Sequence, residues 1–109
     1  MVGFNQGDIV WLDFTPQSGS EQAGRRPALV VSNNDFNEAA RFVLVCPITS
    51  KNKHYPLHCE LPKKMRTKGV IMLDQLKSLD LVARNAEYSG ESLPQNVLAD
   101  VLDKITGFF

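Results

Sequence analysis

The stretch GDIVWLDFTPQSGSEQAGRRPALVVSN, residues 7–33, contains two apolar segments joined by a polar loop. Apolar residues alternate along 7–14, which predicts a strand buried on one face. Residues 26–32, RPALVVS, contain a short continuous apolar run and predict a buried strand, with a long polar loop over 15–25. Two adjacent arginines stand where this loop enters the second strand. Either they are solvated loop charges, or an anion binds against them.

The middle of the chain predicts three more strands and one short helical turn. The turn covers 33–40, and the strands cover FVLVCPITS (42–50), YPLHCEL (55–61) and GVIMLDQLK (69–77). Pro47 lacks an N–H inside the first of these strands, so an edge strand or a bulge is expected there. Their β-branched content and regular turn signals favour a small, curled antiparallel sheet or barrel.

The last eighteen residues, SLPQNVLADVLDKITGFF (92–109), change from strand to helix periodicity. Their apolar residues recur at helical spacing: Val97, Leu98, Val101, Leu102 and Ile105. Ser92 and Gln95 match a capping box, Pro94 is tolerated in a first turn, and Gly107 suits the C-terminal end. We expect an amphipathic helix whose apolar stripe packs on the sheet as core rather than as an interface.

Length and composition indicate one globular domain spanning 1–109. Apolar residues make up 43% and charged residues 22% of the 109, which are ordinary values for a folded domain. No run approaches the roughly 20 apolar residues of a membrane helix, and the N-terminus lacks a signal-peptide pattern, so a cytoplasmic protein is expected. Cys46 and Cys59 fall on apolar strand faces and are expected to be reduced core thiols, without zinc-ligand spacing.

The formal net charge is zero, but basic residues are concentrated in one segment. Residues 51–68 contain one acid and six of the twelve basic residues: Lys51, Lys53, Lys63, Lys64, Arg66 and Lys68. Such a band could attract a polyanion locally. A solvated lysine-rich loop is an equally good interpretation of charge alone.

Three side chains are candidates for chemistry. Arg26 precedes Pro27, which favours an extended backbone, and its planar guanidinium matches a phosphate; the alternative is a salt bridge to Glu21 or Asp13. Thr49 ends its strand on the face opposite Ile48, so its hydroxyl is expected to point away from the apolar side. 

His58 faces away from the apolar side of its strand and could act as acid or base, although such a histidine is more often a surface residue. No metal-ligand pattern and no Ser-His-Asp motif is found. From the residues alone, the prediction is a small barrel with an anion-binding face.

The quoted stretch also resembles the opening of the MazF/PemK family of toxin endoribonucleases. The resemblance is carried by GSEQAG followed two residues later by Arg-Pro, and it continues through CPITS, YPLHCEL and DQLKSLD. It covers nearly the whole chain in order. It implies a mainly β (α+β) fold, an SH3-like or plasmid-toxin antiparallel barrel with a C-terminal helix, working as a homodimer.

The resemblance further implies sequence-specific, ribosome-independent cleavage of single-stranded RNA without a metal or other cofactor. The RNA 2′-hydroxyl would attack the phosphorus, leaving a 2′,3′-cyclic phosphate and a 5′-hydroxyl. Arg26 matches the family's catalytic arginine, Thr49 its catalytic threonine, and Glu21 a glutamate important for activity. Asp74 and Gln75 match residues that contact bases. Weaker candidates for RNA contact are Ser20, Gln22, Arg25, Lys53, Tyr55, Pro56, Lys77 and Arg84.

Three functions are weighed. The first is an RNA-cleaving toxin silenced by a small acidic antitoxin whose disordered tail occupies the basic groove. The second is a non-enzymatic toxin of the same fold that binds and poisons DNA gyrase, which needs neither Arg26 nor Thr49 and relies on the C-terminal helix. The third is a nucleic-acid-binding barrel without catalysis, against which the presence of Arg26, Thr49 and Glu21 argues. The role of His58 stays open.

Overall fold

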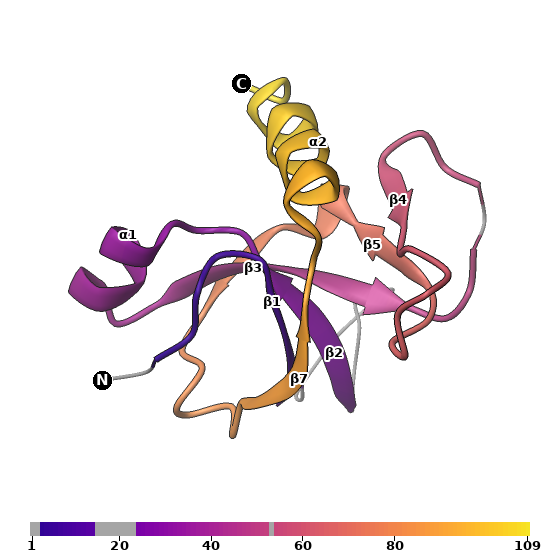
Figure 1. The fold of residues 1–109 in the computed structure, drawn as a ribbon. Helices are drawn as coiled ribbons and strands as arrows, with labels where there is room; N and C mark the ends of the chain where they lie inside the picture. Colours follow the sequence, from indigo (N-terminus) through magenta and orange to yellow (C-terminus); the bar gives the residue numbers. More distant parts are fainter. Residues whose placement is uncertain (1–2, 15–23, 53) are drawn as a thin grey trace.

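The computed structural model describes residues 3–14, 24–52 and 54–109 (Figure 1). Within them the chain forms one antiparallel sheet, two α-helices and a short 3-10 helix. In chain order the elements are β1 (Asp8–Asp13), β2 (Arg25–Val30), α1 (Asn34–Ala39), β3 (Val43–Thr49), β4 (His58–Glu60), β5 (Val70–Met72), η1 (Leu73–Gln75), β6 (Lys77–Leu79), β7 (Glu87–Ser92) and α2 (Gln95–Thr106). This confirms a mainly β fold with a C-terminal helix.

The strands lie in the order β4-β5-β3-β2-β1-β7, and β6 pairs with the first part of β3. Every pairing is antiparallel. In Figure 1, α1 lies beside the start of β3, and β4 and β5 lie toward the opposite end of that strand. The central strand β3 therefore connects the long β1–β2 hairpin to the short strands that follow it.

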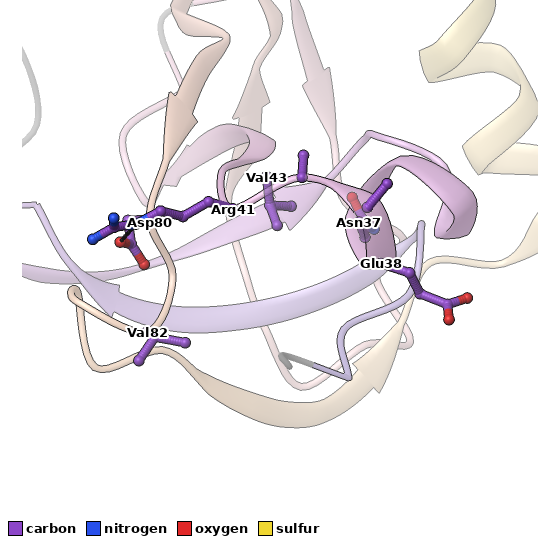
Figure 2. Close-up of a pocket in the computed structure, with 8 residues that line it drawn as sticks. Asn37, Glu38, Arg41, Val43, Asp80 and Val82 are labelled. Carbon is purple, nitrogen blue, oxygen red and sulfur yellow. Dashed lines mark hydrogen bonds and ion pairs between the residues drawn. The ribbon is translucent and has the colours of Figure 1, made fainter.

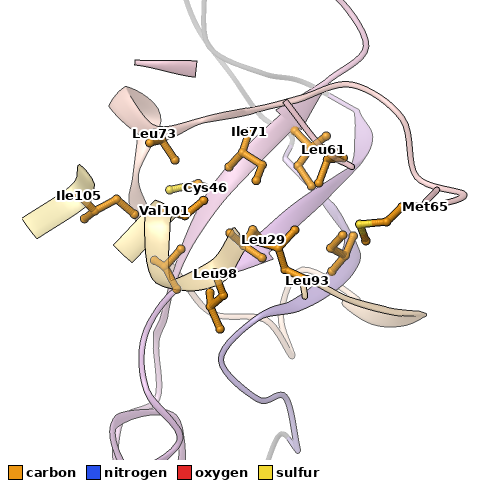
Figure 3. Close-up of a cluster of buried hydrophobic side chains, with 13 residues drawn as sticks. Leu29, Cys46, Leu61, Met65, Ile71, Leu73, Leu93, Leu98, Val101 and Ile105 are labelled. Carbon is orange, nitrogen blue, oxygen red and sulfur yellow. The ribbon is translucent and has the colours of Figure 1, made fainter. Parts of the chain in front are cut away.

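Both faces of the sheet are apolar, so the protein has two cores. One core lies between the sheet and α2, and includes Leu29, Cys46 and Val101 (Figure 3). The other core covers the opposite face and includes Val30 and Val45. Alternate residues of β2 and β3 point to opposite faces, which explains the continuous apolar run within 26–32.

Helix α2 packs on the sheet through Leu98, Val101 and Ile105, as its spacing predicts (Figure 3). Gly107 stands at the C-cap and donates its N–H to the Asp103 carbonyl, as expected. The predicted capping box is wrong, because Pro94 is the N-cap and no side chain caps the helix. Ser92 instead ends β7, where its hydroxyl donates to Asp8 Oδ1 at 2.8 Å.

Two predicted strands are shorter than the sequence suggests. Only His58–Glu60 of 55–61 forms a strand, because the preceding residues form a turn. The predicted strand 69–77 is broken into β5, the 3-10 helix η1 and the start of β6, because β3 pairs first with β6 and then with β5. Strand β7 was not predicted, because EYSGES has no apolar alternation and is largely exposed.

Pro47 lies in the centre of the sheet rather than at an edge or a bulge, so this prediction is also wrong. The register of β3 with β2 is continuous, with Pro47 opposite Ala28. On its other side, β3 pairs with β6 as far as Val45 and with β5 from Ile48 onward. Pro47 falls in the interval between these two ladders, where its missing N–H costs no ladder hydrogen bond.

Both cysteines are free and belong to the core, as expected. Burial raises the pKa of the Cys46 thiol to about 12, and the Asp74 charge adds to this increase. Cys59 is half-buried and packs against the same core. Among the described residues, neither helix is long and apolar enough to cross a membrane.

Candidate functional site

The two adjacent arginines at the start of β2 project to opposite faces, because neighbouring strand residues alternate. Arg25 forms ion pairs with Asp13 Oδ1 at 3.2 Å and Glu87 Oε1 at 2.5 Å. Hydrogen bonds from Asn85 and then from Arg25 hold the pKa of Asp13 below its ordinary value. The ion pair to Asp13 that the sequence offers as an alternative for Arg26 is thus formed by Arg25.

The register of β2 with β3 relates Arg26 to Thr49. Ala28 pairs with Pro47 in the β2–β3 ladder, so continuing this antiparallel register by two residues sets Arg26 opposite Thr49. By alternation both side chains belong to the face that carries Val30 and Val45. The extended register therefore assigns neighbouring positions on one face to the two candidates predicted for catalysis, which are 23 residues apart in sequence.

Thr49 is 8% exposed, because the face opposite Ile48 is covered by the second core rather than by solvent. Its hydroxyl accepts the N–H of Lys51 at 3.2 Å, which fixes the side chain where β3 ends. Gly69 packs against the same residue with φ +124°, and a Cβ there would lie 2.1 Å from the Thr49 carbonyl oxygen. Only glycine permits this close approach of the two backbones.

Arg26 contributes to the lining of a cavity of about 350 Å³, whose other strand residues alternate onto the opposite face of the sheet from the Arg26 and Thr49 side chains. The remaining lining residues are Trp11, Arg25, Pro27, Ile48, Ser50, Arg66, Thr67 and Lys68. Arg66 and Lys68 are two of the six basic residues of the band 51–68, so a third of that signal leads to this cavity. The place of Trp11 and Thr67 in its lining was not predicted. Trp11 is 40% exposed, and an aromatic residue on the polar side of an alternating strand was the available clue.

Glu91 of β7 holds the basic loop in place. Its carboxylate accepts the N–H groups of Arg66 and Thr67, each at 2.8 Å, and the Thr67 hydroxyl at 2.8 Å. These hydrogen bonds, first from Arg66 and then from Thr67, lower the pKa of Glu91 below 4.5. Sequence analysis missed Glu91, because strand β7 itself was not predicted.

The second predicted contact pair, Asp74 and Gln75, lies on η1 at the other side of β3. Asp74 Oδ1 is 3.6 Å from His58 Nε2. The His58 side chain is 7% exposed, so the interpretation of a surface histidine is wrong. Alternation correctly placed it away from the main core, but η1 and the Tyr55 ring, 5.1 Å away between centroids, cover that face.

The structure also describes most of the weaker candidates for RNA contact. Lys77 Nζ lies 5.7 Å from the centre of the Phe14 ring, and Arg84 Nη1 donates to the Asp13 carbonyl at 3.3 Å. Tyr55 and Pro56 are exposed in the turn before β4. The predicted residues Ser20, Glu21, Gln22 and Lys53 lie outside the described residues.

A separate cavity of about 460 Å³ lies between α1 and the segment after β6 (Figure 2). Arg41 and Asp80 form an ion pair at its rim, with Nε and Oδ2 2.9 Å apart. The Asn37 side chain at its other end is already hydrogen-bonded to Ser32 and Phe4. This cavity is lined by α1, Val43 and Val82 and is distinct from the Arg26 cavity.

Comparison with known proteins identifies the family. Residues 5–109 match the family described as PemK-like, MazF-like toxin of type II toxin-antitoxin system. The endoribonuclease toxin MazF of Escherichia coli (strain K12) is 40% identical over 93 residues, which are 85% of this chain and 83% of that protein.

Solved structures share this fold. The crystal structure of MazF (Form I) from Deinococcus radiodurans has a TM-score of 0.89 at 41% identity, covering 99% of this chain and 97% of that one. A chain of the MazE–MazF structure (Form II) from the same organism has a TM-score of 0.85 at 41% identity, covering 99% and 96%.

Proposed function

The chain belongs to the PemK-like, MazF-like toxin family of type II toxin-antitoxin systems, and from that membership we propose that it cleaves single-stranded RNA at a short sequence. It is an endoribonuclease toxin with an antitoxin partner, as its relatives and the MazE–MazF structure indicate. The finer proposal is that cleavage requires neither the ribosome nor a metal ion. The proposal is supported by the β2–β3 register, which when extended by two residues sets Arg26 opposite Thr49, and by the Arg66 and Lys68 side chains of the cavity that Arg26 also lines.

In the proposed reaction the RNA supplies its own nucleophile. The 2′-oxygen loses its proton and bonds to the adjacent phosphorus, and the bond from phosphorus to the 5′-oxygen breaks. The leaving 5′-oxygen takes up a proton, so the products are a 2′,3′-cyclic phosphate and a 5′-hydroxyl. The protein therefore has to stabilise charge and hold geometry rather than provide an attacking group.

Arg26 stabilises the negative charge that develops on the phosphoryl oxygens. Its guanidinium stays protonated at physiological pH, so it acts through charge and hydrogen bonds rather than as a proton donor. Thr49, on the neighbouring β-strand β3, donates a hydrogen bond to the scissile phosphate or contacts the RNA 2′-oxygen. Glu21, outside the described residues, is proposed to aim Arg26 or to contact the RNA.

Arg66, Lys68 and Trp11 extend this site along the cavity. Two cations bind the phosphate backbone, and an exposed indole offers a face on which a base can stack. We propose that a small acidic antitoxin inhibits by occupying the same basic surface, and that the toxin works as a homodimer. Neutral net charge is compatible with both partners, because the positive charge is local.

The test is end mapping after cleavage in the presence of a chelator. Purified protein is incubated with a long unstructured RNA in EDTA, and the new ends are located by primer extension and tested for a 5′-hydroxyl. Discrete cuts with 5′-hydroxyl ends are expected. Intact RNA in the presence of folded protein would contradict the proposal and favour the gyrase-binding alternative, which an assay of gyrase supercoiling then examines.

A further inference from the structure

We infer that Glu91 is a positioning residue for RNA binding, and that this acid increases the affinity of the protein for a polyanion. It does so by holding the basic loop, residues 62–68, so that Arg66 and Lys68 meet the RNA backbone. This inference rests on the proposed function and names the residue that orders part of its binding surface. Charge alone predicts the opposite effect, because a carboxylate beside cations lowers the local positive potential.

The basic loop is closed at its base and anchored at its centre. The Leu61 N–H donates to the Gly69 carbonyl at 3.0 Å, next to the paired strands β4 and β5. Met65 is 7% exposed and belongs to the core between the sheet and α2 (Figure 3). Across the loop, Lys68 Nζ donates to the Lys63 carbonyl at 2.6 Å. These contacts fix both ends of the loop and one side chain at its centre.

Glu91 binds the backbone of this loop rather than its charges. Its two carboxylate oxygens accept the N–H groups of Arg66 and Thr67, and Oε1 also accepts the Thr67 hydroxyl, all at 2.8 Å. Arg66 Nε lies 3.8 Å from Glu91 Oε2, which is longer than a hydrogen bond. The Glu91 side chain is 15% exposed and the Arg66 side chain 75% exposed. The carboxylate is therefore satisfied by backbone and hydroxyl donors, and the guanidinium stays accessible to a ligand.

A second acid of β7 meets an arginine in a different way. Glu87 forms a close ion pair with the guanidinium of Arg25, which also contacts Asp13. The Arg25 side chain is only 36% exposed. The charge of Arg25 is thus compensated by direct contact, whereas Arg66 keeps an accessible charge because Glu91 holds its backbone. Two carboxylates on one strand therefore have opposite consequences for a polyanion.

The Arg66 guanidinium lies against a glycine of β7 and near an exposed indole. A Cβ at Gly90 would lie 3.2 Å from Arg66 Nη2, so the missing side chain leaves room for the guanidinium. Trp11, Arg66 and Thr67 together line two cavities, of about 350 and 210 Å³, and Glu91 lines the smaller one. A nucleotide with its base on Trp11 and its phosphate on Arg66 suits this arrangement.

The first measurement compares variants that remove one negative charge from β7. All proteins carry Arg26→Ala, so that a short labelled RNA stays intact, and affinity is measured by fluorescence anisotropy at one salt concentration. Glu91→Gln places an amide among backbone donors and should bind RNA about three- to tenfold more weakly, because the loop then has to be ordered on binding. The control Glu87→Gln removes the same charge from a residue that contacts Arg25, and should bind equally well or more tightly.

A double-mutant cycle shows whether Glu91 acts through Arg66. When Arg66→Gln is already present, Glu91→Gln should weaken RNA binding by at most about twofold, because the charge that it positions is gone. A merely structural role gives the same factor in both backgrounds. With Arg26 intact, Glu91→Gln should raise the enzyme concentration at half-maximal single-turnover rate more than it lowers the maximal rate. The reason is that Trp11 and Arg26 alternate onto opposite faces of the sheet.

The outcomes separate the two proposals. Equal or tighter RNA binding by Glu91→Gln, or equal factors in the cycle, overturns the inference alone. If wild type binds RNA but leaves it intact, the proposed cleavage fails and the affinities still decide the role of Glu91; if it neither binds nor cuts RNA, both fail. Should Glu91→Gln not fold, Thr67→Val removes one of the three hydrogen bonds without a change of charge. An about two- to threefold loss of affinity then supports the inference, and unchanged affinity overturns it.

Discussion

At the scale of single residues, adjacent arginines acquire different roles because a strand turns alternate side chains to opposite faces. Arg25 is held by Asp13 and Glu87, whereas the β2–β3 register, extended by two residues, sets Arg26 opposite Thr49. The ion pairs of Arg25 with Asp13 and Glu87 are structural, whereas the proposed catalytic charge is that of Arg26. The two roles differ because neighbouring strand residues face different surroundings.

Replacing Arg26 should therefore affect cleavage far more than replacing Arg25. For Arg26→Ala we expect the single-turnover cleavage rate to fall roughly 100-fold or more, because preorganised charge at the transition state is lost. Arg25→Ala should reduce it only a few-fold, since that guanidinium already serves two carboxylates. Rates are measured on one RNA, with circular dichroism to verify folding. Equal losses in both variants would contradict the proposed roles.

Gly69 gives a second test at this scale. A Cβ at Gly69 would lie 2.1 Å from the Thr49 carbonyl oxygen, on a backbone with φ +124°. We expect Gly69→Ala to lower the free energy of unfolding by more than about 2 kcal/mol, measured by urea denaturation.

The matched control for Gly69→Ala is Gly24→Ala. Gly24 also has positive φ (+78°), but no described atom lies within 4 Å of its Cβ position. Only the backbone cost of about 1 kcal/mol should apply there. A loss at Gly24 as large as that at Gly69 would mean that backbone conformation, not the contact with Thr49, sets the cost.

At the scale of elements, strand β7 shows how a polar segment can be structural. It pairs with β1, and its Glu91 binds the loop of Arg66 and Thr67 through three hydrogen bonds. The strand thereby holds in place Arg66 and Thr67, which line the cavity that Arg26 also lines. The stability that these hydrogen bonds contribute depends on the ionisation of the Glu91 carboxylate.

Because of Glu91, the folded protein should become less stable as the pH is lowered. The pKa of Glu91 is lowered in the folded protein, so unfolding takes up a proton, and the stabilisation is complete above the ordinary value of 4.5 and lost as pH falls through the lowered pKa. We expect the wild-type Tm to decrease more steeply than that of Glu91→Gln below about pH 5. Parallel pH profiles of Tm for the two proteins would rule out this contribution.

At the scale of the whole molecule, a neutral chain carries a local positive surface. Arg26, Arg66 and Lys68 line one cavity although acidic and basic residues are equal in number. Local charge, not net charge, determines attraction to an RNA backbone at short range, because salt screens distant charges within about 10 Å.

RNA binding should consequently weaken with salt, and one side chain should change the slope. Arg66→Gln is expected to reduce the slope of log affinity against log salt by about 0.7, the value for one phosphate contact of a single strand. Lys104→Gln removes the same charge from the last turn of α2 and should leave the slope unchanged. Fluorescence anisotropy with a short labelled RNA measures both, and equal slopes for wild type and Arg66→Gln would remove Arg66 from the binding surface.

Local pattern in the sequence determined the elements whose periodicity is long and apolar. The alternation of 7–14, the buried run of 26–32 and the helical stripe of α2 all predict the observed structure, because burying apolar surface dominates folding energetics. The motif around Arg26 also led to the correct family. These features are short-range, so they can be recognised along the chain.

Only the tertiary structure decided the features that depend on partners distant in sequence. The placement of Pro47 between two ladders, the break of 69–77 into three elements and the burial of His58 under η1 follow from which strands pair with β3. The ion pairs of Arg25 and the hydrogen bonds from the loop of Arg66 to Glu91 likewise join residues from separate strands and loops. Strand pairing is non-local, and one sequence pattern is compatible with several pairings until the whole sheet forms.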